Sequence, residues 1–139
     1  MRAISLWQPW ASAVANGVKR IETRHWRTWY HSPIAIHAAK RKTHAMGHQF
    51  RDLFRIEAIY NAFLLSDEDC WNLLPFGAVV ATAVLQDCVP TDMITKSTLS
   101  PTELALGDYS TGRYAWILTD IKKLPKPIPA VGRRGLFNV

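Results

Sequence analysis

Cysteine is scarce in this chain of 139 residues, and long apolar runs are missing from it. The only two cysteines, Cys70 and Cys88, make neither a disulfide framework nor a CxxC metal motif, so we expect two reduced thiols. No apolar run approaches the roughly 20 residues that a membrane-spanning helix needs. The first residues also lack the charged start and apolar stretch of a secretory signal. We therefore expect a cytoplasmic protein with no membrane partner.

A single domain spanning residues 1–139 fits the length, because a chain of this size buries roughly two-thirds of the surface that its unfolded form exposes. Apolar residues make up 48% of the sequence and charged residues 20%, without any low-complexity stretch. This composition is that of an ordinary globular protein and excludes a mainly disordered chain.

Charge is distributed unevenly, although the chain as a whole carries a formal charge of +6. Residues 19–55 hold nine Lys and Arg against two acidic residues, residues 57–112 hold one against eight, and residues 113–139 hold six against one. A surface polarised in this way attracts polyanions over long distances. Nucleic acid is the obvious partner, although many small basic proteins bind no anion.

Helix and strand patterns are mixed along the chain, which predicts an α+β fold. Strands are predicted at residues 3–7, 20–24, 33–38, 77–85 and 113–121, with a terminal strand after a basic turn at 132–137. Helices are predicted at residues 9–16, 43–64 and 66–73, with a fourth, short one capped by Ser100. Gly17 fits a left-handed C-cap, and the prolines at 125, 127 and 129 favour an extended path at a sheet edge. The total is about six strands and three to four helices.

One face of the predicted helix at 43–64 is basic. Its residues are spaced four, three and four apart, which places them on a single side: His44, His48, Arg51 and Arg55. This face is either a solvated surface that keeps the helix soluble or a rail that binds phosphates and releases their counterions. His44 and His48 have the spacing of a metal pair but lack an evident third ligand. We expect no metal and no cofactor.

The densest group of polar and aromatic side chains follows the first predicted helix. Lys19 and Arg24 offer a point charge and a forked donor for phosphate or a base edge, and Glu22 can neutralise them or accept from an amine. Flat faces come from three tryptophans, Trp7, Trp10 and Trp26, and a stacked base typically contributes about 1 to 3 kcal/mol. Core packing of the tryptophans and a surface ion-pair cluster remain the alternatives. A shared cleft also requires Lys19 to lie in the turn after Gly17, because alternation in a strand would point it away from Glu22 and Arg24.

Several blocks of the sequence form an ordered set: Ser5-Leu6-Trp7-Gln8-Pro9-Trp10-Ala11, Gly17-x-Lys19-x-Ile21-Glu22-x-Arg24-x-Trp26, Ile34-Ala35-Ile36-His37-Ala38-Ala39, Gly77-Ala78-Val79-Val80 and Arg113-Tyr114-Ala115-Trp116. Together they resemble an ASCH domain (activating signal cointegrator homology) over essentially the whole chain. The resemblance implies a mixed β-barrel of the PUA-like superfamily with peripheral helices and a cleft associated with RNA or DNA. Residues 40–74 would then be a helical insertion. Fold membership alone does not assign an activity.

A nucleic-acid binding module is the first of two functions that this resemblance allows. Its cleft would receive a single-stranded or flipped base without any chemistry. The expected contact residues are Trp7, Gln8, Lys19, Glu22, Arg24, Trp26, His37, Tyr114 and Arg133, with His48, Arg51 and Arg55 as the basic rail. For His37, a hydrogen-bonded place in the core is an equally good interpretation.

A small hydrolase is the second function, because the family includes amidohydrolases that act on N4-acetylcytidine and members that cleave RNA. Lys19 would then match the catalytic lysine, with Glu22 beside it. The amidohydrolase subgroup carries threonine where this chain has Glu22, and a carboxylate next to a lysine favours its protonated form. Glu103 and Asp108 are candidates for a second carboxylate by analogy alone. The motif is therefore better suited to holding a nucleotide than to cutting one.

Overall fold

Six strands form one sheet in the computed structural model, which describes residues 1–41 and 74–139. The strands are β1 (Arg2–Leu6), β2 (Ile21–Arg24), β3 (Pro33–Ala38), β4 (Ala78–Pro90), β5 (Tyr114–Pro129) and β6 (Phe137–Asn138). The helices are α1 (Trp10–Ala15) and α5 (Pro101–Ala105), and two 3-10 turns span Thr91–Met93 and Lys96–Thr98. None of the helices in the described residues is long and apolar enough to cross a bilayer.

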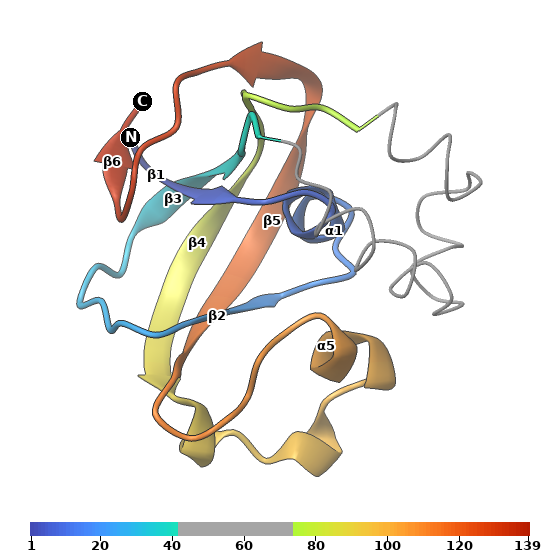
Figure 1. The fold of residues 1–139 in the computed structure, drawn as a ribbon, viewed down its shortest axis with the longest axis vertical. Coiled ribbons are helices and arrows are strands. Elements are labelled where there is room, and N and C mark those ends of the chain that lie inside the picture. The colour runs from blue at the N-terminus through green and yellow to red at the C-terminus, as the bar shows by residue number, and fades with distance from the viewer. Residues whose placement is uncertain (42–73) are drawn as a thin grey trace.

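The sheet is mixed, and its strand order is β2-β5-β4-β3-β1-β6 (Figure 1). β1 and β3 pair in parallel, whereas every other neighbouring pair is antiparallel. β5 pairs with both β2 and β4 at its start, but its proline-rich end pairs with β4 alone. Proline has no backbone N–H to donate, so this one-sided pairing suits it, and the predicted edge-like path is confirmed.

The predicted closed barrel is wrong, because β2 and β6 remain the two unpaired edges of an open sheet. β1 pairs with β6 only at Arg2 and Ala3, and β2 is four residues long. Between β1 and β2, the Arg24 Nη2 atom donates a hydrogen bond to the Ser5 carbonyl oxygen at 2.8 Å. A side chain therefore links the edge strand β2 to β1, which is not its neighbour in the sheet.

Two α-helices, α1 and α5, lie in the described residues, against the three to four predicted for the whole chain. The helices predicted at 43–64 and 66–73 lie outside the described residues, as does the predicted insertion apart from its first and last residues. The strand predicted at 33–38 is confirmed at both ends, and Gly17 ends α1 with the expected left-handed backbone at φ +75°.

The main apolar core lies between α1 and the sheet. Val14 of α1, Ile36 of β3 and Leu85 of β4 are fully buried there together with Trp116 of β5. Burying one large apolar side chain contributes roughly 1.5 to 3 kcal/mol. This packing fixes the turn that leaves α1, and that turn leads directly into the residues of the candidate site.

Helix α5 lies in the lower part of Figure 1, and one of its side chains contacts the start of β2. Ser100 caps the helix, since its Oγ accepts a hydrogen bond from the Glu103 backbone N–H at 3.1 Å. The Glu103 carboxylate turns away from the cap and accepts hydrogen bonds from the backbone N–H groups of Arg20 and Ile21. Of the predicted capping box, the hydrogen bond to the Ser100 hydroxyl therefore forms. The Glu103 side chain, its other member, instead links α5 to the start of β2.

Removing the cap should weaken this connection. We expect Ser100→Ala to lower the free energy of unfolding by about 1 kcal/mol, the usual effect of losing an N-cap oxygen. Ser97, exposed in the adjacent 3-10 turn, supplies the control, and Ser97→Ala should stay within about 0.5 kcal/mol of the wild type. Urea unfolding followed by circular dichroism measures both, and equal losses in the two variants would contradict the capping role.

Candidate functional site

Lys19 is wholly buried in the turn that follows Gly17, and it is not part of β2. Its Nζ atom donates hydrogen bonds to the carbonyl oxygens of Ile21 at 2.6 Å and Leu106 at 3.0 Å. The Glu22 Oε1 atom lies 3.5 Å from the same nitrogen. The turn therefore lets Lys19 meet Glu22, which is the condition that a shared site required.

Glu22 joins the buried lysine to Arg24. Its Oε2 atom lies 3.4 Å from Arg24 Nη2, and this nitrogen also donates to the Ser5 carbonyl oxygen. The Arg24 guanidinium carbon is 5.8 Å from the centre of a Trp116 ring. A continuous chain of polar contacts thus runs from Lys19 inside the protein to Arg24 at its surface.

Tyr109 lies close to this chain of contacts. Its hydroxyl is buried and has no hydrogen-bond partner within the described residues. Burial raises the pKa of the Tyr109 phenol well above its ordinary value, and the charges of Glu103 and Glu22 raise it further. The phenol therefore stays protonated and neutral beside two carboxylates.

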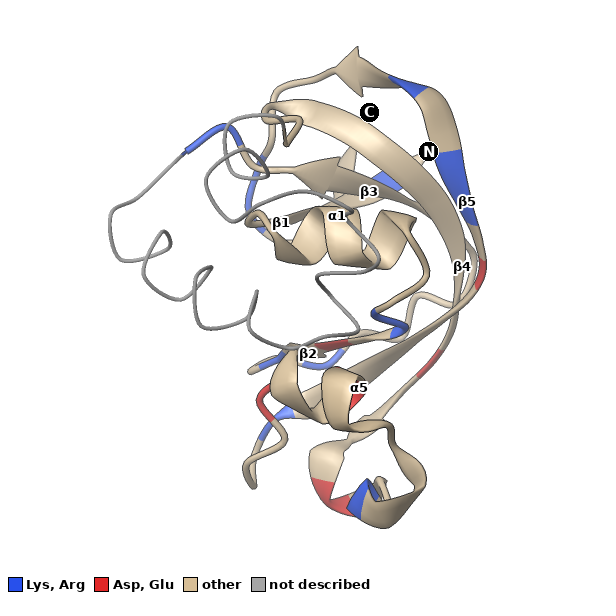
Figure 2. Ribbon diagram, turned by 90° about the vertical axis from the view of Figure 1, so that its right-hand side faces the viewer, with Lys and Arg blue, Asp and Glu red and all other residues tan. Residues whose placement is uncertain are grey.

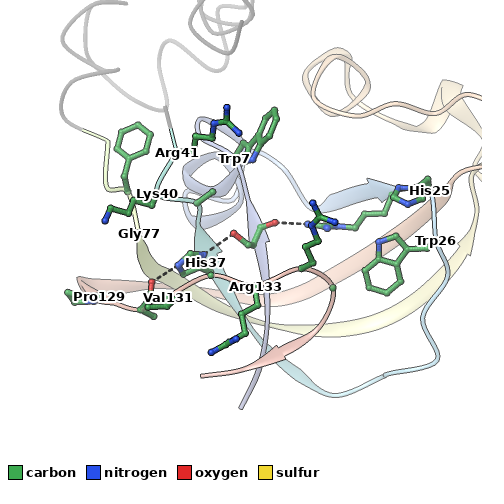
Figure 3. Close-up of a pocket in the computed structure, with 18 residues that line it drawn as sticks. Trp7, His25, Trp26, His37, Lys40, Arg41, Gly77, Pro129, Val131 and Arg133 are labelled. Carbon is green, nitrogen blue, oxygen red and sulfur yellow. Dashed lines mark hydrogen bonds between the residues drawn. The ribbon is translucent and has the colours of Figure 1, made fainter. Parts of the chain in front are cut away.

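A cleft of about 1270 Å³ lies beside Ser5 of β1 and Arg24 of β2, and residues 129–135 form much of its wall. Among the described residues, five basic and no acidic side chains line it, and the basic ones are Arg24, Lys40, Arg41, Arg133 and Arg134. Figure 2 shows Lys and Arg, but no Asp or Glu, in the upper part of the described chain. Trp7, whose exposed fraction is 51%, and Trp26 add flat surfaces to the lining. In Figure 3, Trp7 and Arg41 lie on one side of the cleft, and His25 and Trp26 lie on another.

His37 supports the wall of the cleft that leads into β6. Its Nε2 atom is 2.8 Å from the Ala130 carbonyl oxygen, and its Nδ1 atom is 2.9 Å from the Ser5 hydroxyl (Figure 3). Because a carbonyl oxygen only accepts, the neutral ring carries its proton on Nε2, and Nδ1 accepts from Ser5. A Cβ on Gly132 would lie 2.6 Å from His37 Cε1, so only glycine allows this close approach. His37 is thus a buried, hydrogen-bonded residue that also borders the cleft.

The structure brings some of the predicted contact residues to the cleft: Trp7, Arg24, Trp26, His37 and Arg133. Lys19 and Glu22 lie behind this group and do not line the cleft. Gln8 is buried, and its side-chain nitrogen donates to the Ser12 hydroxyl and to the Pro75 carbonyl oxygen. Tyr114 lies opposite Arg24 in the β2–β5 ladder. The predicted rail of His48, Arg51 and Arg55 lies outside the described residues.

The two further carboxylates suggested by analogy do not join Lys19. Glu103 accepts from backbone N–H groups, and Asp108 is exposed and 3.4 Å from Arg113 Nε. Trp10, the third candidate for a flat face, packs against the apolar core.

Sequence reasoning missed three of the five cleft cations, Lys40, Arg41 and Arg134. Their signal was present as two basic pairs, Lys40-Arg41 just after β3 and Arg133-Arg134 just before β6. In the sequence, both pairs contribute only to the net charge of their regions. No local pattern indicates that residues more than 90 positions apart line the same cleft.

Cys88 is a buried residue of β4. Burial raises the pKa of its thiol, which lowers the fraction of reactive thiolate at neutral pH. Cys70 lies outside the described residues. Within residues 1–41 and 74–139, His, Cys, Asp and Glu side chains form no group of three or more that could hold a metal ion.

The family model of the ASCH domain matches residues 4–128. The chain belongs to the ASCH domain family. Human activating signal cointegrator 1 is 29% identical over 86 residues, and mouse activating signal cointegrator 1 is 28% identical over the same length. The matched region is 62% of this chain and only 14% of each relative. ASCH domains are associated with nucleic acid, and with RNA in particular.

The fold of this ASCH domain is also found in a solved crystal structure of ASCH from Zymomonas mobilis. The two superimpose with a TM-score of 0.59 and 19% sequence identity, over 99% of this chain and 86% of the bacterial one. At this identity the likeness establishes the fold alone. The charges of the cleft have to be argued from this chain's own residues.

Replacing Lys19 tests whether the buried ion pair supports this part of the ASCH domain. We expect Lys19→Met to lower the free energy of unfolding by about 3 kcal/mol, because the Glu22 carboxylate and two carbonyl oxygens lose their cation. Arg20→Met at the neighbouring exposed position removes the same charge and should have little effect. Chemical denaturation of both variants makes the comparison, and a stable Lys19→Met protein would contradict the structural role.

Proposed function

We propose that this ASCH domain binds single-stranded nucleic acid, RNA in the first place, in the basic cleft beside Ser5 and Arg24. The observation that carries the proposal is the charge of the lining, since residues 1–41 and 74–139 contribute five Lys or Arg to it and no Asp or Glu. Phosphates replace the counterions of such a surface, and the release of those ions drives binding. The family's association with nucleic acid supports the same ligand class.

The same cleft offers aromatic side chains on which the bases of the nucleic acid stack. Trp7 is about half exposed immediately after β1. Trp26 is held in place by Trp116, whose ring centre is 4.7 Å away in an edge-on arrangement. Stacking on such rings tolerates any base and contributes about 1 to 3 kcal/mol for each one. A single-stranded or flipped base fits this combination of cations with an exposed and a partly buried indole, whereas a paired base inside a duplex hides its flat face.

The arrangement of Lys19 supports binding more than hydrolysis. A nucleophilic lysine needs a free, unprotonated amine that reaches the substrate. Lys19 is buried, its three donor positions face two carbonyl oxygens and Glu22, and it does not line the cleft. We therefore expect no release of cytidine when the protein is incubated with N4-acetylcytidine, and turnover there would favour the hydrolase instead.

Salt dependence tests the role of the cleft cations directly. For a single strand, the logarithm of the binding constant falls with the logarithm of salt with a slope of about −0.7 per phosphate contact. We expect Arg133→Ala and Arg134→Ala each to weaken binding of a labelled single-stranded RNA and to reduce that slope by about 0.7. Fluorescence anisotropy across a salt series provides the measurement.

Lys122→Ala is the matched control, because Lys122 is an exposed cation of β5 that lies outside the cleft lining. It should retain the wild-type affinity and slope. A wild-type affinity that does not change with salt, or an equal loss in the control, would overturn the phosphate-binding role of the cleft. Repeating the series with DNA of the same sequence shows whether the ribose contributes to the binding affinity.

A further inference from the structure

Trp29 is 77% exposed, although tryptophan is among the largest apolar side chains. It lies between β2 and β3, three residues after Trp26 of the cleft. The Arg27 guanidinium carbon is 4.2 Å from the centre of its ring and 5.8 Å from that of Tyr114. We call Arg27, Trp29 and Tyr114 the stacking platform.

The backbone around the platform is anchored on both sides of Trp29. The Trp116 indole N–H donates to the Trp26 carbonyl oxygen at 3.3 Å, and the Tyr30 hydroxyl donates to the Pro33 carbonyl oxygen at 2.7 Å. Between them, the Thr28 side chain is buried and accepts a hydrogen bond from the Tyr30 backbone N–H. Trp29 is therefore presented to solvent on a fixed backbone, which lowers the entropy lost when a ligand stacks on it.

The platform is continuous with the cleft. Tyr114 pairs directly with Arg24 across β5 and β2, and opposed residues of an antiparallel pair point to the same face of the sheet. Arg24 lines the cleft, and Tyr114 contacts Arg27. Cations and aromatic rings thus alternate from Arg24 through Tyr114 and Arg27 to Trp29.

The charge of Arg27 is not used by an ion pair within the described residues. At the same loop, His31 lies 3.8 Å from the Asp87 carboxylate, but Arg27 makes its contacts with aromatic rings. A guanidinium stacked on an indole still has its N–H groups free at the edge to meet a phosphate. Such a pair offers both a base-stacking surface and a phosphate-binding group, the two elements of single-strand recognition.

We propose that a single strand leaves the cleft over this platform, so that a base stacks on Trp29 and Arg27 binds the adjoining phosphate. This inference rests on the proposed function and sharpens it, since the ligand is then an oligonucleotide of several residues and not a mononucleotide or a free nucleoside. The platform adds affinity only for strands long enough to reach it.

The test compares two lengths of single-stranded RNA, about two nucleotides and about ten, within the range of strand lengths that small single-strand-binding folds cover. Trp29→Ala should weaken binding of the longer strand by roughly five- to 150-fold, which corresponds to one lost stacking contact. Its affinity for the short strand should equal that of the wild type. Trp29→Phe should restore much of the long-strand affinity, because it keeps an aromatic face.

Met93→Ala is the matched control, since Met93 is a similarly exposed apolar side chain of the Thr91–Met93 turn. Circular dichroism verifies that all variants are folded. If Trp29→Ala binds both strands as the wild type does, the platform is not part of the path, and Trp29 is left as a contact for another protein. A loss that is equal for both lengths also overturns the inference. If the wild type binds neither strand, the proposed function fails and the platform proposal fails with it.

Discussion

The hydrogen bond from the Arg24 guanidinium to the Ser5 carbonyl oxygen is the contact on which the candidate site depends. It links the edge strand β2 to β1 across the open side of the sheet, and both of its residues line the cleft. The same nitrogen holds Glu22, and Glu22 holds Lys19. One side chain thus joins two strands, borders the cleft and ends a chain of charges that begins in the interior.

Burying Lys19 would be costly without this arrangement, because an unpaired ammonium in the interior loses several kcal/mol of hydration. Two carbonyl oxygens and the Glu22 carboxylate provide the compensation. The Glu22 carboxylate lies between Lys19 and Arg24 and forms an ion pair with each, so its charge is balanced within the protein. The described lining residues supply cations to the cleft wall and no carboxylate, so this part of the wall is positive. Glu22 therefore links the buried Lys19 to Arg24 at the cleft.

Local patterns in the sequence predicted the elements well, because each depends on neighbours in the chain. The left-handed backbone of Gly17, the cap at Ser100 and the strand Pro33–Ala38 all follow from a few adjacent residues. Closure of the sheet and the partners of Glu103 depend on contacts across about 80 positions, which no local pattern encodes. The meeting of Lys40 and Arg41 with the basic pair before β6 is of the same kind. The structure therefore adds three cations to the predicted cleft residues, and the role of the whole set in binding stays a prediction.

The position of each tryptophan relative to the sheet determines whether its ring is buried or exposed. Trp116 lies in β5 between two neighbouring strands and is fully buried, whereas Trp7 and Trp29 lie just outside strands and stay exposed. Composition alone cannot distinguish these cases, since all three are the same residue type. Arg24, next to the unpaired edge, lies along the chain between the two exposed rings. Because both exposed rings lie outside the strands, no neighbouring strand covers them, and the proposed path of a single strand uses this uncovered aromatic surface.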